Sequence, residues 1–186
     1  QTGSGKTVLL ESMAGFYEEF SGGILYDGRP VHSIPLQDRR LGFVYQDFGL
    51  FPHMKVRANI EYGLRIKGMK RAACEEKSRN MMDLLGFCHL ADRYPGTLSG
   101  GEQQRTALAR ALIVDPRILF MDEPFSALDP NTKKQMYGLV REIHQLFGCT
   151  IVFVTHDFHE AEKLAGRTAV IIGGRVRRIC DSRQLF

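Results

Sequence analysis

Short apolar runs alternate with longer stretches of helical periodicity along this chain. Leu41–Tyr45, Ile118–Met121 and Thr150–Val154 are almost entirely apolar, which is typical of strands buried on both faces of a parallel sheet. From Val56 to about Tyr94, and again from Leu139 to Leu146, apolar residues recur every three to four positions, as on one face of a helix. The pattern therefore predicts an α/β fold with a separate helical stretch.

Glycine marks the expected turns. Asp27-Gly28 lies at the centre of an alternating segment, residues 22–31, which predicts a hairpin. Gly173-Gly174 separates two further apolar runs near the end of the chain, which predicts a closing hairpin. Gly68 indicates a break between two helices of the helical stretch.

Two phosphate-related features lie about thirty residues apart in the middle of the chain. Ser99 can cap a helix that begins at two glycines, so the backbone N–H groups of Gly100 and Gly101 can approach an anion. Asp122 and Glu123 follow the apolar run, where a parallel strand presents ligand-binding groups. A helix N-terminus for phosphate and a pair of carboxylates are thus expected.

The chain begins with Gln1-Thr2-Gly3-Ser4-Gly5-Lys6-Thr7, which fits the P-loop pattern G-x-x-x-x-G-K-[ST] if a glycine precedes Gln1. We therefore expect that the first residues of the loop, the strand before it and an adenine-stacking aromatic residue are missing. Glycines let backbone N–H groups surround phosphate, and Lys6 adds a mobile charge. Thr7 can offer its hydroxyl to Mg²⁺. The alternative, a flexible Gly/Ser linker, leaves Lys6 and Thr7 unexplained.

Composition narrows the classes of function. Lys and Arg number 25 against 21 Asp and Glu, a net charge of +4 without a long run of one sign, so a nucleic-acid partner is not indicated. The four cysteines are widely spaced, as expected for reduced thiols in the cytosol. No apolar stretch reaches the roughly 20 residues of a membrane span, and no signal peptide is recognised. The chain is therefore expected to reach a membrane through a partner.

Taken together, these motifs resemble the ATP-binding subunit of an ABC transporter, over nearly the whole chain. Gln1–Thr7 resembles the Walker A motif, Leu98–Arg105 the signature motif, Ile118–Glu123 the Walker B strand and Ser126–Asp129 the D-loop. The resemblance implies a P-loop NTPase (RecA-like) α/β core with a small antiparallel β part and an inserted helical subdomain. It divides the chain into a core at residues 1–47 and 109–186 and a helical subdomain at residues 48–108 that carries the signature.

The resemblance also implies residue roles in ATP hydrolysis. Glu123 acts on the attacking water, while Gln46 and His156 complete the surroundings of that water. Mg²⁺ is held by Thr7, Gln46 and Asp122. Contacts with ATP are implied for Gln1, Thr2, Gly3, Ser4, Gly5, Lys6, Thr7, Ser99, Gly100, Gly101 and Asp129. In the family, the signature meets ATP bound to the opposite subunit, so a head-to-tail homodimer with ATP at its interface is expected.

Residues 43–54 and 59–64 resemble importer ATPases, and most of all those of the molybdate/tungstate group, with sulfate, iron, polyamine and sugar importers as alternatives. This implies transmembrane permease subunits, an indirect solute-binding partner and a peripheral place on the cytoplasmic face of the cell membrane. Apolar residues of 47–55 either fill the seam between subdomains or dock a permease helix. One competing class is a soluble ABC ATPase that acts on nucleic acid. Another is an ordinary P-loop kinase or GTPase, but this class leaves the signature motif unexplained.

Overall fold

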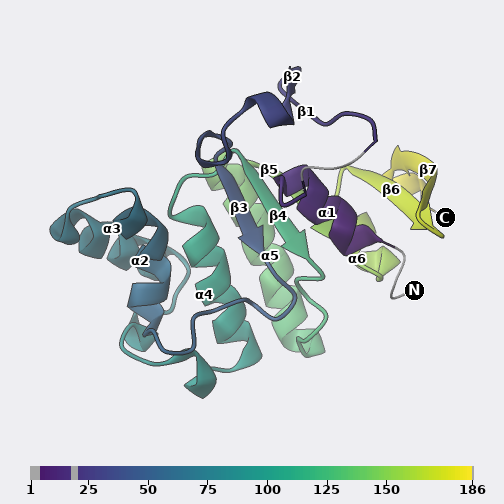
Figure 1. Ribbon diagram of the computed structural model, residues 1–186. Helices are drawn as coiled ribbons and strands as arrows, with labels where there is room; N and C mark the ends of the chain where they lie inside the picture. The colour runs from purple at the N-terminus through teal and green to yellow at the C-terminus, as the bar shows by residue number, and fades with distance from the viewer. Residues whose placement is uncertain (1–4, 18–20, 186) are drawn as a thin grey trace.

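A three-stranded parallel sheet forms the centre of the fold (Figure 1). The computed structural model describes residues 5–17 and 21–185, so the predicted nucleotide contacts at residues 1–4 lie outside the described residues. The strands are β3 (Leu41–Val44), β4 (Ile118–Asp122) and β5 (Thr150–Val154), in the order β3-β4-β5. The predicted α/β class with a parallel sheet is confirmed.

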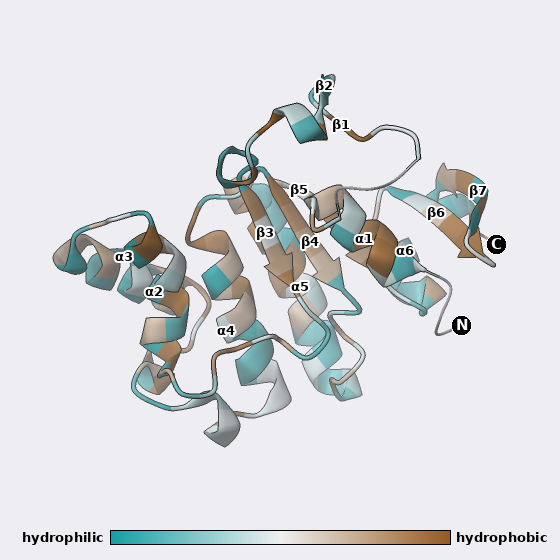
Figure 2. Ribbon diagram, viewed as in Figure 1, coloured by the Kyte–Doolittle hydropathy of each residue, from teal (hydrophilic) through white to brown (hydrophobic). Residues whose placement is uncertain are grey.

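Strand β4 is central because both of its faces are apolar. Leu119 and Met121 belong to the large core formed with the helices on one side of the sheet. Phe120 packs on the opposite face against Leu10 and Ala14 of helix α1. Figure 2 shows hydrophobic residues concentrated on these strands. Successive side chains of a strand point to opposite faces, so an uninterrupted apolar run is what a strand covered on both sides requires.

Helices cover both faces of the sheet. Helix α1 (Lys6–Ala14) lies against β4 and β5, whereas α4 (Gly100–Leu112) packs against β3. Helix α5 (Pro130–Phe147) shares the large core with α4, and α6 (Phe158–Leu164) contacts α5. Of the apolar residues expected on the buried face of α5, Val140 and Ile143 are buried, but Leu146 is 64% exposed. That expectation was wrong for Leu146, because the buried stripe of α5 runs through Met136, Val140, Ile143 and Phe147, and Leu146 lies beside it.

The predicted helical stretch forms two helices, α2 (Val56–Ile66) and α3 (Arg71–Leu84), with Gly68 between them at φ 75°. Helix α2 packs on both α3 and α4. The helical stretch therefore shares one continuous core with the sheet, through α4.

Both predicted hairpins are present and short 3₁₀ turns join several elements. The hairpins are β1 (Leu25–Tyr26) with β2 (Arg29–Pro30), and β6 (Arg167–Ile172) with β7 (Arg175–Asp181), each antiparallel. The 3₁₀ turns span Val31–Ser33, Leu36–Asp38, Cys88–Leu90, Pro95–Thr97 and Ser182–Gln184.

Candidate functional site

Three predicted site residues follow the carboxyl ends of three adjacent strands. Val44 pairs with Met121, and Asp122 pairs with Val154, so β3, β4 and β5 end almost level. Gln46, Glu123 and His156 come within two residues of those ends. The loops after parallel strands form the usual ligand-binding edge of such a sheet. Figure 1 shows the arrowheads of β3 and β4 at this edge.

Asp122 is the buried member of the carboxylate pair. Its side chain points to the α1 face, as Phe120 does, and the residue is only 4% exposed. Burial raises the pKa of Asp122, the nearby Thr7 side chain lowers it, and the charge of Glu123 raises it. Its Oδ1 atom is buried without a hydrogen-bond partner among the described residues. A buried carboxylate oxygen without a partner is costly, which makes Asp122 a candidate ligand-binding group.

Glu123 is turned away from Asp122 by its backbone. Its φ of 42° lies in the left-handed region, which non-glycine residues rarely adopt. Its N–H donates to the carbonyl of Val154 at 2.9 Å, which secures the turn to β5. The Glu123 carboxylate then lies 3.1 Å from Nδ1 of His156, with side-chain exposures of 19% and 59% respectively. The structure thus brings two of the predicted catalytic residues into direct contact.

The environment of Asp122 fits a hard divalent cation. Mg²⁺ prefers oxygen ligands and keeps several waters, so one carboxylate, one hydroxyl and substrate phosphates suffice. Asp122 offers an unpaired buried oxygen and Thr7 is exposed beside it. Within residues 5–17 and 21–185, no group of three or more His, Cys, Asp or Glu could hold a metal by itself. Further ligands of a cation here would have to come from Thr7, from water or from a bound ligand.

The start of α1 supplies the positive end of the site. Gly5 precedes the helix at φ 79°, a left-handed conformation suited to glycine, and the first turn has no acidic residue. Lys6 borders a cavity of about 610 Å³ that Thr155 and His156 also line. Most of the cavity lies between apolar residues of α1, β5 and β6. The end next to Lys6 and His156 has groups suited to phosphate.

The signature helix begins as predicted. Ser99 accepts from the N–H of Glu102, and Glu102 accepts from the N–H of Ser99 at 2.7 Å, which completes a capping box. These hydrogen bonds lower the pKa of Glu102. Ser99 itself is exposed at the start of α4. An exposed helix N-terminus is thus available to a ligand from outside the chain.

The signature glycines lie against two neighbouring segments of the same chain, Gly100 against the D-loop and Gly101 against the start of α5. A Cβ atom on Gly101 would lie 2.8 Å from Cγ2 of Thr132, whereas one on Gly100 would have 3.6 Å of space to Leu128. Asp129, predicted to contact ATP, accepts from the N–H groups of Asn131 and Thr132 at 3.0 and 3.2 Å. It therefore caps helix α5, and contact with nucleotide stays a prediction.

The loop that carries Gln46 is held by an arginine that the sequence analysis did not single out. Gln46 is exposed, and the chain then passes through left-handed residues at Phe48 and Gly49, with φ of 65° and 55°. Arg110 of α4 donates to the carbonyl of Gly49 at 2.8 Å and of Phe48 at 3.3 Å. Periodicity places Arg110 on a buried face of α4, and that was the available signal.

The apolar loop after Gln46 divides into buried and exposed parts. Phe48 is buried in the large core, and Phe51 stacks on Tyr62, with ring centroids 4.6 Å apart. Pro52 and His53 are exposed. The buried part fills the seam between the sheet and the helices, as one of the two readings expected. Only the exposed part remains for docking.

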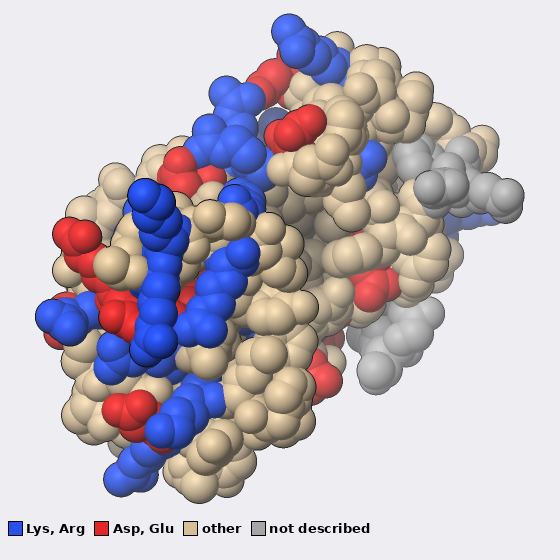
Figure 3. All heavy atoms as spheres, turned by 60° about the vertical axis from the view of Figure 1, so that its left-hand side comes forward, with Lys and Arg blue, Asp and Glu red and all other residues tan. Residues whose placement is uncertain are grey.

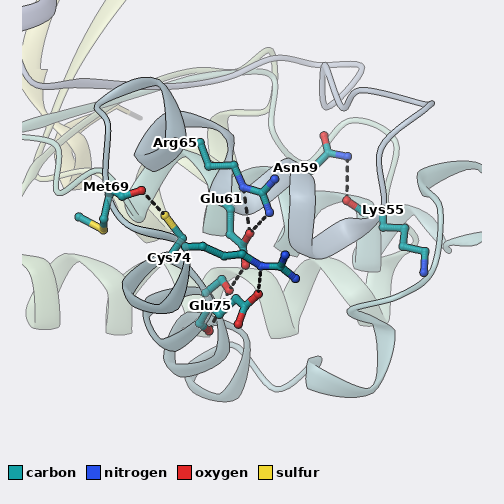
Figure 4. A network of polar contacts seen from close by, with 9 residues as sticks. Lys55, Asn59, Glu61, Arg65, Met69, Cys74 and Glu75 are labelled. Carbon is teal, nitrogen blue, oxygen red and sulfur yellow. Dashed lines mark hydrogen bonds and ion pairs between the residues drawn. The ribbon is translucent and has the colours of Figure 1, made fainter.

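Buried Asn59 fixes the shape of this loop. Its amide accepts from the N–H of Phe51 at 2.8 Å and donates to the carbonyl of Met54 at 2.9 Å. Its side chain also approaches the carbonyl of Lys55, as Figure 4 shows. In the same figure, buried Glu61 accepts from Arg65 and so joins the network of α2. The loop at residues 47–55 therefore has a defined shape, held by hydrogen bonds from Asn59.

Lys and Arg side chains gather over the helical part in Figure 3, with Asp and Glu between them. Lys67, Lys70 and Arg71 are exposed, as expected for a solvated face. Across the described part of the chain, no helix has the length and apolar character needed to cross a membrane.

Comparison with known proteins identifies the family of the chain. A family model described as "ABC transporter" matches residues 1–126. The chain is 42% identical over 177 residues to the sulfate/thiosulfate import ATP-binding protein CysA 2 of Agrobacterium fabrum, covering 94% of this chain and 52% of the relative. It is 43% identical over 185 residues to the molybdate/tungstate import ATP-binding protein WtpC of Pyrococcus horikoshii, covering 100% and 54%.

A third relative is covered over more of its length. It is the probable sulfate/thiosulfate import ATP-binding protein CysA of Chlorella vulgaris, 40% identical over 184 residues, with 99% of this chain and 78% of the relative aligned. The chain spans about half the length of the first two relatives.

Proposed function

This chain belongs to the ABC transporter family, and we propose that it hydrolyses ATP to drive solute import through a membrane permease. The observation that carries the proposal is the divergence of the two carboxylates after β4. Asp122 is buried towards Thr7, whereas Glu123 turns towards His156. This arrangement separates a cation ligand from a group that handles the attacking water.

In the proposed mechanism, positioning and charge neutralisation carry phosphoryl transfer to water. Gly3, Ser4, Gly5 and Lys6 hold the β- and γ-phosphates. Thr7 and Asp122 would hold Mg²⁺, and Gln46 would be a further ligand. When bound, the cation would neutralise phosphate charge. Glu123 orients the water or accepts its proton, while Nδ1 of His156 holds the Glu123 carboxylate in place.

The signature residues are proposed to act on a second copy of the chain. Ser99 is exposed, and its hydrogen bonds are made within its own helix start. We infer a head-to-tail dimer in which Ser99, Gly100 and Gly101 of one copy meet the ATP of the other. The core at residues 1–47 and 109–186 and the helical subdomain at residues 48–108 would then move relative to each other through the Gln46 loop.

The partners are proposed from the exposed docking loop and from the names of the relatives. Pro52 and His53 would meet a permease helix at the cytoplasmic face of the membrane, and a solute-binding protein would deliver the solute. The relatives are named for sulfate/thiosulfate and for molybdate/tungstate. All four solutes are oxyanions, so we propose an oxyanion importer. Reconstitution of the permease complex with its solute-binding protein, followed by measurement of sulfate and molybdate uptake, tests this proposal. If neither anion is taken up, the proposal is contradicted.

Glu123→Gln tests the catalytic role. Glutamine keeps the size of the side chain but cannot accept a proton, so turnover should fall about 10²- to 10⁴-fold, the usual worth of a general base. ATP binding should be retained, because Glu123 contacts His156 rather than the start of α1. Phosphate release by the purified complex measures turnover, and equilibrium binding of an ATP analogue measures affinity. Wild-type turnover would remove Glu123 from this role.

A further inference from the structure

Helix α6 contains a buried carboxylate that the proposed mechanism does not use. Glu160 is 3% exposed and lies four residues after His156. We propose that Glu160 is a positioning residue that holds His156 against Glu123. This inference rests on the proposed function, because it concerns how the water-binding pair is kept in place.

One oxygen of Glu160 is connected by hydrogen bonds to the residues on both sides of His156. Oε2 accepts from the hydroxyl of Thr155, the residue before His156. The same hydroxyl oxygen accepts from the N–H of Asp157, the residue after it, at 3.0 Å. His156 therefore lies between two residues that are tied to one buried carboxylate.

The other oxygen of Glu160 ties this loop to helix α5. Oε1 accepts from Nζ of Lys133 at 3.1 Å and from the hydroxyl of Tyr137 at 3.3 Å. Burial and the charge of Glu160 raise the pKa of Tyr137 to about 12, so its hydroxyl remains a donor at neutral pH.

Tyr137 connects Glu160 to the segment that follows Glu123. Its ring packs edge-on against Phe125, with centroids 5.0 Å apart and an interplanar angle of 89°. Phe125 is fully buried and lies two residues after Glu123. The chain links Glu123 to Phe125, and contacts continue through Tyr137 and Glu160 to Thr155, beside His156. The direct contact between Glu123 and His156 has a second, outer connection.

A role in geometry explains why an acid is buried here. Burial of a carboxylate is costly even when it is paired, and well-packed apolar residues often replace buried ion pairs without loss of stability. What an apolar residue cannot supply is a set of directed acceptors for Thr155, Lys133 and Tyr137. Catalytic groups need such positioning, because a displacement of about 1 Å can cost about 10²-fold in rate.

The test uses the full-length protein in complex with its permease. Glu160→Ala should lower kcat by roughly 10- to 100-fold while KM for ATP stays close to that of the wild type. Glu160→Gln should recover part of the loss, since its carbonyl can still accept from Thr155. Glu142→Ala, at an exposed glutamate of α5, is the matched control and should leave kcat unchanged.

The decisive measurement is a double-variant cycle with His156→Ala. If Glu160 acts through His156, adding Glu160→Ala to His156→Ala should cause no further loss of kcat. If the double variant shows the product of the two single-variant losses of kcat, the inference is overturned. It is also overturned if Glu160→Ala keeps the wild-type kcat while His156→Ala is impaired. Wild-type kcat in His156→Ala would instead overturn the proposed role of His156. If Glu160→Ala does not fold, Thr155→Val removes the connecting hydroxyl and should reproduce the loss of kcat; an unchanged kcat there contradicts the inference.

Discussion

At the scale of single residues, adjacent carboxylates acquire different chemistry from their surroundings. Asp122 ends the central strand with its side chain buried, and burial raises its pKa. Glu123 is released from the strand by a left-handed φ of 42° and reaches His156 instead. A strand alternates its faces, so two consecutive acids cannot share one environment. This is why one can serve as a cation ligand and the other can act on water.

The raised pKa of Asp122 predicts a pH-dependent effect of Asp122→Asn. A carboxyl group with a raised pKa in the folded state favours its protonated form. The stability from that proton is fully present below the usual Asp pKa of about 3.9 and is lost as pH rises through the folded pKa. Asparagine carries no charge at any pH. In nucleotide-free protein, the variant should therefore unfold at a higher temperature than wild type at neutral pH, and the difference should shrink towards about pH 4.

Thermal unfolding at several pH values, without nucleotide or Mg²⁺, measures this difference. The same variant should also lose the Mg²⁺ dependence of ATP binding, because the buried oxygen that lacks a partner would no longer be a carboxylate. A stability difference that is constant from acidic to neutral pH would contradict the prediction.

At the scale of elements, α4 connects several parts of the site. Its start carries Ser99, and its last turn both packs closely on β3 and, through Arg110, binds the loop after Gln46. The contact with β3 is so close that Gly42 leaves no room for a side chain. A Cβ atom there would lie 2.9 Å from the carbonyl oxygen of Ala111 and 3.0 Å from Cδ1 of Leu119. Gly42 therefore sets how near α4 approaches the sheet.

Gly42→Ala should lower the free energy of unfolding by about 1–3 kcal/mol, because the added methyl group meets backbone rather than a flexible side-chain end. Gly138→Ala is the matched control in the interior of α5, where an added Cβ has no atom within 4 Å. It should raise the free energy of unfolding by about 0.5–1 kcal/mol through better helix propensity. Urea denaturation of both variants measures these changes in the free energy of unfolding. Equal changes in the two variants would show that the close contact of α4 with β3 leaves room for a methyl group at Gly42.

At the scale of the whole molecule, the proposed ATP site is completed by a second copy. The phosphate-binding start of α1 and the Glu123–His156 pair lie at one edge of the sheet, while Ser99 is exposed at the start of α4. ATP would then join two surfaces that neither copy brings together alone. A ligand can favour the closed dimer only through its higher affinity for that state.

Ser99→Arg should block ATP-dependent dimerisation while a monomer still binds ATP, because a long charged side chain would occupy the interface of the two copies. Light scattering with and without ATP, in the Glu123→Gln background to prevent turnover, measures the dimer. Asn80→Arg adds the same side chain at an exposed position of α3 and should leave the dimer intact. A normal ATP-dependent dimer in Ser99→Arg would show that the signature is not at the interface.

The sequence by itself determined the elements and the chemical types of the site. Apolar runs identified β3, β4 and β5, and Ser99 was identified as the cap of a helix, because both depend on local backbone rules. Motif spacing identified Asp122 and Glu123 as candidates, and the family resemblance added His156. Patterns of this kind involve residues that are close together in the chain, so they can be recognised without knowledge of the tertiary structure.

Only the tertiary structure decided which distant side chains meet. The contact of Glu123 with His156, the hold of Arg110 on the Gln46 loop and the ties from Glu160 to Thr155 and Lys133 join separate elements. Leu146 likewise has the periodicity of a buried residue, yet no element covers it. Burial and pairing are set by the packing of elements on one another, which a linear pattern of apolar and polar residues does not specify.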